Sequence, residues 1–320
     1  MAAKPLISFI ITSYNVSADM LRECISNILH IPLNESEREI ILIDDGSDES
    51  PLAGIGELQE QVTYIRQRNA GVSVARNRAL EIATGDYIQF VDGDDYLRPE
   101  VYALLLEKGK KDIASSRVDV ILFASATSEN EDNGDTTPTD PMDGGAYLRT
   151  HNLHGSVCCF LFRKNILGNL RFTPGVAYAE DEEFTPQLLL RAEQVIEIPL
   201  KAYFYRQHRT SATHQVDGDT IQKRLDDTHG VILRLSKLVD SVPQNDAEGF
   251  RRRVAQLTMD YLYNIIVLTH SHKELERRID QLKTEGLFPL NSKDYTQKYK
   301  YFRKFINTHL GRLLLCRVLR

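Results

Sequence analysis

The chain is poor in cysteine, lacks tryptophan, and contains no long apolar run. Its four cysteines, Cys24, Cys158, Cys159 and Cys316, show no C-x-x-C spacing, so we predict neither a zinc knuckle nor a disulfide framework. A reducing, cytoplasmic compartment fits this usage best. Because no run of about 18 apolar residues exists, we expect no segment that spans a bilayer. The apolar run after Lys4 is too short for a signal peptide.

The composition is that of a globular protein with an uneven distribution of charge. The 320 residues are 42% hydrophobic and 26% charged, and the formal net charge is −6. The length fits one large domain, or one domain with an appendage. Residues 293–320 nevertheless hold eight Lys or Arg and one acid, Asp294. The rest of the chain is therefore strongly acidic, which disfavours nucleic acid as a partner.

The first 125 residues alternate between strand and helix patterns. Short apolar runs predict strands at 6–12, 38–45, 62–67, 86–92 and 118–125. A helical apolar stripe runs from Leu21 to Leu29, and further helices are predicted at 71–83 and 98–111. This alternation predicts an α/β fold, with a mostly parallel sheet and helices on both faces.

Two later regions have a different character. Residues 126–145 are polar, acidic and rich in turn residues, which predicts a surface loop or a mobile flap. From about residue 219 the apolar periodicity is helical.

Each of the first four predicted strands ends in a polar cluster. These clusters are Thr12–Asn15, Asp44–Ser47, Arg68–Gly71 and Asp92–Asp95. The carboxyl ends of parallel strands lie at one edge of a sheet, where ligands of open α/β sheets bind. Any single cluster is equally well explained as a helix cap or an Asx turn. Four in succession favour one shared binding site.

Three carboxylates lie within four residues, at Asp92, Asp94 and Asp95. Like charges held that close repel unless a proton or a cation relieves them. Oxygen ligands favour Mg²⁺ or Mn²⁺, which keep open positions for substrate phosphates. We therefore predict a metal that bridges a diphosphate to Asp94, with Asp92 nearby. The alternative is a plain surface turn, because D-G is a common turn dipeptide.

Four segments together resemble the family 2 glycosyltransferases, which are inverting enzymes with the GT-A fold. They are "SFIITSYN", "ILIDDGSDES", "RNAGVSVARNRALEIATGDYIQFVDGDDY" and "AEDEEF", and the resemblance covers about residues 5–215. It implies a Rossmann-like GT-A domain at 1–217, with a nucleotide-sugar half at 1–125 and an acceptor and base half at 126–217. A helical region would follow at 218–320.

The resemblance implies a nucleotide pocket at the first strand ends. Its members would be Thr12, Tyr14, Asn15, Asp44, Asp45 and Arg76. Asp45, with Asp44 beside it, would contact the base, and a carboxylate that accepts from uracil N3–H fits a UDP-type donor, although GDP and dTDP stay open. Arg76 would face the nucleotide with its fork of donors. The alternatives are a structural turn for Asp44 and an exposed helix face for Arg76.

The resemblance also implies the catalytic groups. Asp92-x-Asp94 matches the family's DxD motif, with Asp94 as direct metal ligand and Asp92 as ribose or metal contact. Asp95 matches the acidic position that follows the motif and would support the two aspartates without binding the metal directly. In "YAEDEEF", Asp181 matches the catalytic base that takes the proton of the acceptor hydroxyl. A charged helix start is the alternative for this acidic run, and Glu180, Glu182 and Glu183 compete for the assignment.

The segment 203–213, "YFYRQHRTSAT", resembles one that closes over the diphosphate in part of the family. Arg206 and Ser211 match its R-x-x-x-x-S pattern, and His208 would be an extra metal ligand. A loop cation without a role is an equal alternative. The absence of Trp removes the Q/R-x-x-R-W motif of processive synthases, which favours the addition of a single sugar.

Residues 299–320 interleave aromatic, leucine and basic residues. A single helix here would gather one broad apolar face, formed by Phe302, Phe305, Ile306, Leu310, Leu313 and Leu314. This pattern is typical of a helix on an anionic membrane surface, and equally of a helix packed on the body. Peripheral attachment to the inner face of the cytoplasmic membrane would suit an acceptor carried on a polyprenyl lipid.

The sequence thus predicts a glycosyltransferase that transfers one sugar from a nucleotide-sugar to a glycan or polyprenyl-linked acceptor, with Mn²⁺ or Mg²⁺ as cofactor. The acceptor expected from the resemblance is a bacterial surface polysaccharide unit. A sugar nucleotidyltransferase would usually carry an early Gly-rich loop with basic residues, which "FIITSYNVSADM" lacks. A catalytically silent nucleotide-binding or scaffold protein is the other alternative.

Overall fold

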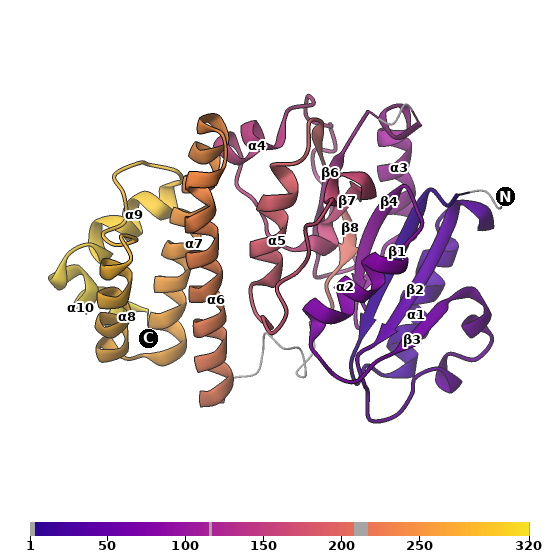
Figure 1. The fold of residues 1–320 in the computed structure, drawn as a ribbon, viewed down its shortest axis with the longest axis horizontal. Helices are drawn as coiled ribbons and strands as arrows, with labels where there is room; N and C mark the ends of the chain where they lie inside the picture. Colours follow the sequence, from indigo (N-terminus) through magenta and orange to yellow (C-terminus); the bar gives the residue numbers. More distant parts are fainter. Residues whose placement is uncertain (1–3, 115–116, 208–216, 320) are drawn as a thin grey trace. The chain divides into compact units, whose positions relative to one another are not determined.

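The computed structural model describes residues 4–114, 117–207 and 217–319. The chain forms two compact units (Figure 1). The N-terminal unit comprises 1–144 and 154–208, and the helical unit comprises 145–153 and 209–320.

The N-terminal unit is built on an eight-stranded sheet in the order β3-β2-β1-β4-β7-β6-β8-β5. Its first four strands along the chain are β1 (Ile7–Ser13), β2 (Arg38–Asp44), β3 (Thr63–Arg66) and β4 (Tyr87–Asp92), and they are parallel neighbours. The side chains of β1 are almost all buried, as expected of a central parallel strand. The sequence prediction of these strands is confirmed, and their carboxyl ends share one edge.

The rest of the sheet mixes strand directions. It contains β5 (Tyr96–Leu97), β6 (Val120–Ala126), β7 (Phe160–Arg163) and β8 (Val195–Phe204). β7 runs antiparallel to β4 and β6, while β6 and β8 are parallel. β5 follows β4 directly in the chain but pairs antiparallel with β8 at the far end of the order. The sheet therefore curls, which brings the end of β8 to the end of β4.

The helices of this unit match the predicted stripes where a prediction was made. The α-helices are α1 (Ala18–His30), α2 (Val72–Ile82), α3 (Pro99–Ala114) and α5 (Glu180–Leu189). Short 3₁₀ helices lie at η1 (Glu35–Glu37), η2 (Ala53–Gln61), η3 (Val157–Cys159) and η4 (Lys164–Leu167). The predicted loop after residue 126 is confirmed over 127–141, which holds no helix or strand.

The helical unit consists of α4 (Gly144–Thr150), α6 (Gly218–Leu238), η6 (Val239–Ser241), α7 (Gln244–Thr269), α8 (His272–Thr284), α9 (Gln297–Ile306) and α10 (His309–Val318). The long helices α6 and α7 lie side by side (Figure 1). None of the helices in the described part of the chain combines the length and apolar character needed to cross a membrane.

Two buried arginines of α7 explain why residues 145–153 belong to the helical unit. Arg252 donates to the carbonyl of His151 at 2.6 Å and to Oδ1 of Asn152 at 2.8 Å. Arg253 donates to the carbonyl of Leu153 at 2.9 Å. These bonds satisfy backbone carbonyls that would otherwise lie buried without donors.

Candidate active site

The DxD segment leaves the sheet at the end of β4. Asp92 is the last residue of the strand and lies opposite Thr12 of β1. The backbone N–H of Gly93 donates to the carbonyl of Thr12 at 2.9 Å. A Cβ at Gly93 would lie 3.0 Å from that same oxygen and 3.0 Å from Leu21. A glycine is thus what lets the chain turn tightly against β1, with half-buried Asp92 and Asp94 on either side.

Asp95 joins the end of β8 to the DxD turn. Its buried carboxylate accepts from the Tyr203 hydroxyl at 2.7 Å and from the backbone N–H of Arg206 at 2.8 Å. Burial, and then the charge of Asp92, raises the pKa of Asp95 to about 8. Asp95 is therefore a buried structural residue that hydrogen-bonds the end of β8 to the DxD turn. The Tyr203 hydroxyl also accepts from the N–H of Asp92 at 3.2 Å.

The two aspartates after β2 hold loops. Asp44 is fully buried and accepts from the N–H of Ser47 and the hydroxyl of Tyr64, both at 2.9 Å. Asp45 accepts from the side-chain amide of Gln67 at 2.7 Å and from the N–H of Gly71 at 2.8 Å. For Asp44 these bonds match the structural-turn alternative. Base recognition by Asp45 stays a prediction.

The loop after β1 is tied to the loop after β2. Asn15 has a positive φ of 53°, and its Oδ1 accepts from the N–H of Asp48 at 2.8 Å. The N–H of Asn15 donates to the Ser47 hydroxyl at 2.9 Å. Tyr14, next to it, is exposed. The structure therefore places the predicted pocket residues at adjacent strand ends, with Asn15 occupied in joining the loops and Tyr14 free to meet a ligand.

Arg76 of α2 has partners other than those predicted. Its side chain is only 3% exposed, so the exposed-face alternative is wrong. Its Nη1 donates to Glu180 at 2.9 Å and to Asp181 at 2.6 Å, and its Nη2 donates to Asp92 at 3.0 Å. The expected fork of donors to a nucleotide is thus directed at three carboxylates of the protein instead. The guanidinium links the DxD motif to the acidic motif of α5.

The acidic motif opens helix α5 from a strained position. Ala179, the N-cap of α5, has left-handed backbone angles (φ 65°, ψ 19°), which cost an L-residue roughly 1–2 kcal/mol. Glu180 and Asp181 follow directly, and both side chains are mostly buried against Arg76. The second oxygen of Asp181 accepts from the N–H of Val157 at 3.1 Å. Both oxygens of the predicted base are therefore held in place.

Burial shifts the pKa of both acids of this motif. Burial, and then the negative charge of Asp181, raises the pKa of Glu180, while the charge of Arg76 opposes that rise. Burial also raises the pKa of Asp181, although the charge of Arg76 opposes that rise. A carboxylate with a raised pKa is a better proton acceptor than one in water. The raised pKa thus makes Asp181 a better base than an aspartate in water.

The carboxylates of the DxD turn create a negative field at the site. Burial, and then the charges of Asp95, Asp92 and Asp94, raises the pKa of the Cys24 thiol. Burial, and then the charge of Asp92, also raises the pKa of the Cys158 thiol. The Sγ atom of Cys158 lies 3.6 Å from Oδ2 of Asp92. This negative field, on hard oxygen donors at a strand end, suits a divalent cation such as Mg²⁺ or Mn²⁺.

Of the three residues predicted after β8, one is described. Arg206 donates to Glu23 of α1 at 2.7 Å, and its guanidinium lies 5.5 Å from the ring centre of Tyr96. It therefore stands beside the DxD turn. His208 and Ser211 lie outside the described residues, so their predicted roles stay predictions.

The comparisons with known proteins agree with this geometry. The model of the family described as "Glycosyl transferase family 2" matches residues 8–171, which is more than half of the chain. The chain belongs to this family. An uncharacterized glycosyltransferase, EpsJ of Bacillus subtilis, is 29% identical over 228 residues, which cover 65% of this chain and 63% of EpsJ. The chain thus aligns with less than two thirds of that relative.

Solved structures show the same fold. Residues 1–349 of TarS from S. aureus, in complex with UDP-GlcNAc, superpose with a TM-score of 0.60 at 16% identity, covering 94% of this chain and 90% of TarS 1–349. The mannosyltransferase PcManGT from Pyrobaculum calidifontis, in complex with GDP-Man and Mn²⁺, gives 0.57 at 14% identity, covering 98% and 86%. The predicted α/β GT-A fold with C-terminal helices is confirmed for this family 2 chain.

Proposed function

We propose that this chain is a metal-dependent inverting glycosyltransferase that transfers a single sugar from a UDP-sugar to a glycan acceptor. The observation that carries the proposal is the bridge made by Arg76. One buried guanidinium binds Asp92 of the DxD turn and Asp181 of α5 at once. Asp92 is expected to help hold the donor, and Asp181 is expected to activate the acceptor. Because both bind the same guanidinium, they lie close together in the N-terminal unit.

The donor would bind along the carboxyl edge of the parallel strands. The loops after β1 and β2 would receive the nucleoside, because exposed Tyr14 and the loop held by Asp45 lie there. Asp94, with Asp92, would hold the cation, which would bind the diphosphate and stabilise it as the leaving group. Arg206, beside the same turn, would add positive charge to the diphosphate side.

Asp181 would serve as the general base. In an inverting transfer the acceptor hydroxyl attacks the anomeric carbon opposite the departing diphosphate, and it loses its proton during the attack. Arg76 and the Val157 N–H fix the orientation of the Asp181 carboxylate. Burial raises the pKa of Asp181, which strengthens this carboxylate as a proton acceptor.

For the acceptor we propose a glycan of a bacterial surface polysaccharide, either free or carried on a polyprenyl lipid. A lipid-linked acceptor would place the enzyme at the inner face of the cytoplasmic membrane. The described part of the chain offers no helix that crosses a bilayer, so attachment through these residues would be peripheral.

A thermal-shift panel with nucleotides tests the proposed donor site. UDP, GDP, CDP and dTDP are each added with and without Mn²⁺, to wild type and to Asp94→Ala. We expect UDP with Mn²⁺ to raise the melting temperature by several degrees, because a ligand at about 100 times its Kd stabilises the folded state by about 2.7 kcal/mol. Asp94→Ala should lose most of that shift, since a metal ligand is gone.

Asp86→Ala is the matched control. Asp86 is an exposed aspartate that precedes β4 at the opposite end from the DxD turn. This variant should show the same UDP and Mn²⁺ shift as wild type. An equal shift in Asp94→Ala would remove the metal role from the DxD turn, and no shift with any nucleotide would favour the scaffold alternative.

A further inference from the structure

The exposed apolar side chains of the described residues concentrate at the end of the chain. Eight large hydrophobic residues are exposed, and two of them, Tyr14 and Leu104, lie in the N-terminal unit. The other six are Tyr301, Phe305, Leu310, Leu313, Leu314 and Val318, all on α9 and α10. Scattered apolar residues on a surface are ordinary, but a contiguous set marks an interaction site.

Helix α9 uses two faces differently. Tyr299, Phe302 and Ile306, at helical spacing, are buried in the helical unit. Tyr301, Lys304 and Phe305 form the next face and are exposed. The helix is therefore docked by one apolar face and presents a second to solvent.

Helix α10 presents a complete helical stripe to solvent. Residues at i, i+3, i+4, i+7 and i+8 lie on one side of a helix and usually face a core. Here that stripe is exposed, with Leu310 at 79% and Val318 at 67% exposure. Its members are Leu310, Leu313, Leu314, Arg317 and Val318. The opposite side, with Arg312 and Cys316, is buried.

This structure corrects the expected single amphipathic helix. Thr308 caps a new helix, because its side chain accepts from the N–H of Gly311 at 3.1 Å. The region therefore forms two helices, α9 and α10, and not one continuous helix. A Cβ at Gly311 would lie 2.0 Å from the carbonyl of Phe305, which shows how closely the two helices meet. Phe302 and Ile306, expected on the membrane-facing side, are packed inside.

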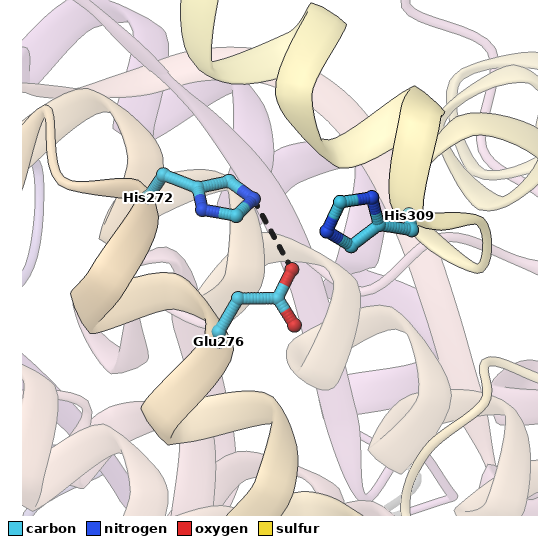
Figure 2. A group of neighbouring side chains, drawn as sticks. All are labelled: His272, Glu276 and His309. Carbon is cyan, nitrogen blue, oxygen red and sulfur yellow. Dashed lines mark ion pairs between the residues drawn. The ribbon is translucent and has the colours of Figure 1, made fainter.

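Polar contacts hold the buried side of α10 against α8. Arg312 donates to Glu276 of α8 at 2.6 Å and to the carbonyl of Ile306 at 3.1 Å. Nε2 of His272 lies 3.2 Å from Oε1 of Glu276. Figure 2 shows this pair with His309 of α10 close by. These three side chains have the composition of a metal site. The guanidinium already neutralises the carboxylate, so we assign the cluster to holding α10 against α8.

The charges of this surface point to one kind of partner. No Asp or Glu follows Asp294 in the sequence. Lys298 and Lys300 pair with Asp260 and Asp294 of the helical unit, whereas Lys304 and Arg317 are exposed within or beside the apolar stripes. A second copy of the same surface would bring cations against cations with no carboxylate between them. An anionic lipid surface supplies the missing negative charge and accepts the leucines.

We propose that this surface, the α9–α10 patch (Tyr301, Lys304, Phe305, Leu310, Leu313, Leu314, Arg317 and Val318), binds the protein peripherally to anionic membranes. The leucines and aromatic rings enter the boundary between headgroups and acyl chains, while Lys304 and Arg317 meet lipid phosphates. The inference goes beyond the transfer reaction and does not depend on it, because it concerns residues outside the candidate active site.

Vesicle sedimentation tests the patch without donor, acceptor or metal. The 320-residue protein is mixed with phosphatidylcholine vesicles that contain about 30% phosphatidylglycerol, or none. Wild type should sediment with the anionic vesicles, and less so in about 0.5 M NaCl. A Leu310→Asp and Leu314→Asp double variant should bind at least about tenfold more weakly, since charge replaces buried apolar area. Lys304→Glu with Arg317→Glu should also lose about tenfold.

Leu104→Asp is the matched control, because Leu104 is an exposed leucine of α3, 38% accessible. It should sediment like wild type. All the altered side chains are exposed, so circular dichroism should show unchanged folding. Wild type that stays in solution with anionic vesicles overturns the proposal, and so does equal sedimentation of the double leucine variant. Dimers that Leu310→Asp and Leu314→Asp dissociate, without vesicle binding, would assign the patch to a second copy.

Discussion

Replacing Asp181 with asparagine is expected to lower kcat by about 10²–10⁴-fold, the usual contribution of a general base. Asparagine keeps the shape of the side chain, and its one carbonyl oxygen can still accept from Arg76. Its amide nitrogen cannot accept from the Val157 N–H, and the side chain cannot take a proton from the acceptor. The affinity for UDP should change little, because the base lies on the acceptor side. Transfer rates and UDP binding, measured on the same preparations, give both quantities.

Glu182→Gln serves as the control for Asp181. Glu182 stands one residue further in the first turn of α5 and is not among the carboxylates bound by Arg76. This variant should keep kcat close to that of wild type. If Glu180→Gln abolished transfer and Asp181→Asn did not, the assignment of the base would move to Glu180.

Replacing Arg76 with methionine should have the largest effect on stability. The change removes one buried cation from Asp92, Glu180 and Asp181 and leaves their charges together without compensation. Removal of one partner of a buried ionic cluster costs about 3–5 kcal/mol. Transfer should be lost as well, because the DxD turn and the start of α5 would no longer be joined.

Urea unfolding followed by far-UV circular dichroism measures this effect, since the chain has no Trp for fluorescence. Arg78→Met is the matched control, as Arg78 is exposed on the same helix α2. Its free energy of unfolding should lie within about 0.5 kcal/mol of wild type. A similar small loss for Arg76→Met would contradict the role given to the buried guanidinium.

The sequence predicts the first half of the sheet well because local pattern and packing agree there. The runs at β1, β2 and β4 are apolar, short and bounded by turn residues, as buried parallel strands must be. β7 and β8 were not predicted. Their pairing joins segments far apart in the chain, β4 with β7 and β6 with β8, and no local pattern encodes such partners.

The position of Arg76 in the motif was predictable, but its partners were not predicted. A signal was present, because Arg76 falls on the same helical stripe of α2 as Ser73, Ala79 and Leu80, which are all buried. A cation on a buried stripe needs buried carboxylates. The hydrogen bond between Tyr203 and Asp95 had no such signal, since the two residues lie 108 positions apart in the sequence.

The end of the chain shows a helix break that its sequence contains. Thr308 is a favoured N-cap type, and its side chain caps α10. Apolar periodicity alone merged the two helices into one and placed Phe302 and Ile306 on the wrong side. The exposed stripe of α10 follows the same periodicity as a buried one, so exposure could only be seen in the structure.

The stereochemistry of donor hydrolysis tests the account most directly, because water can replace an unidentified acceptor. The sugar released from the preferred UDP-sugar in the presence of Mn²⁺ is followed by proton NMR before its anomers equilibrate. We expect the anomer opposite to that of the donor, and far slower release with Asp94→Ala. Release of the donor's own anomer, or release that is equally fast without a divalent cation, would contradict a metal-dependent inverting transferase.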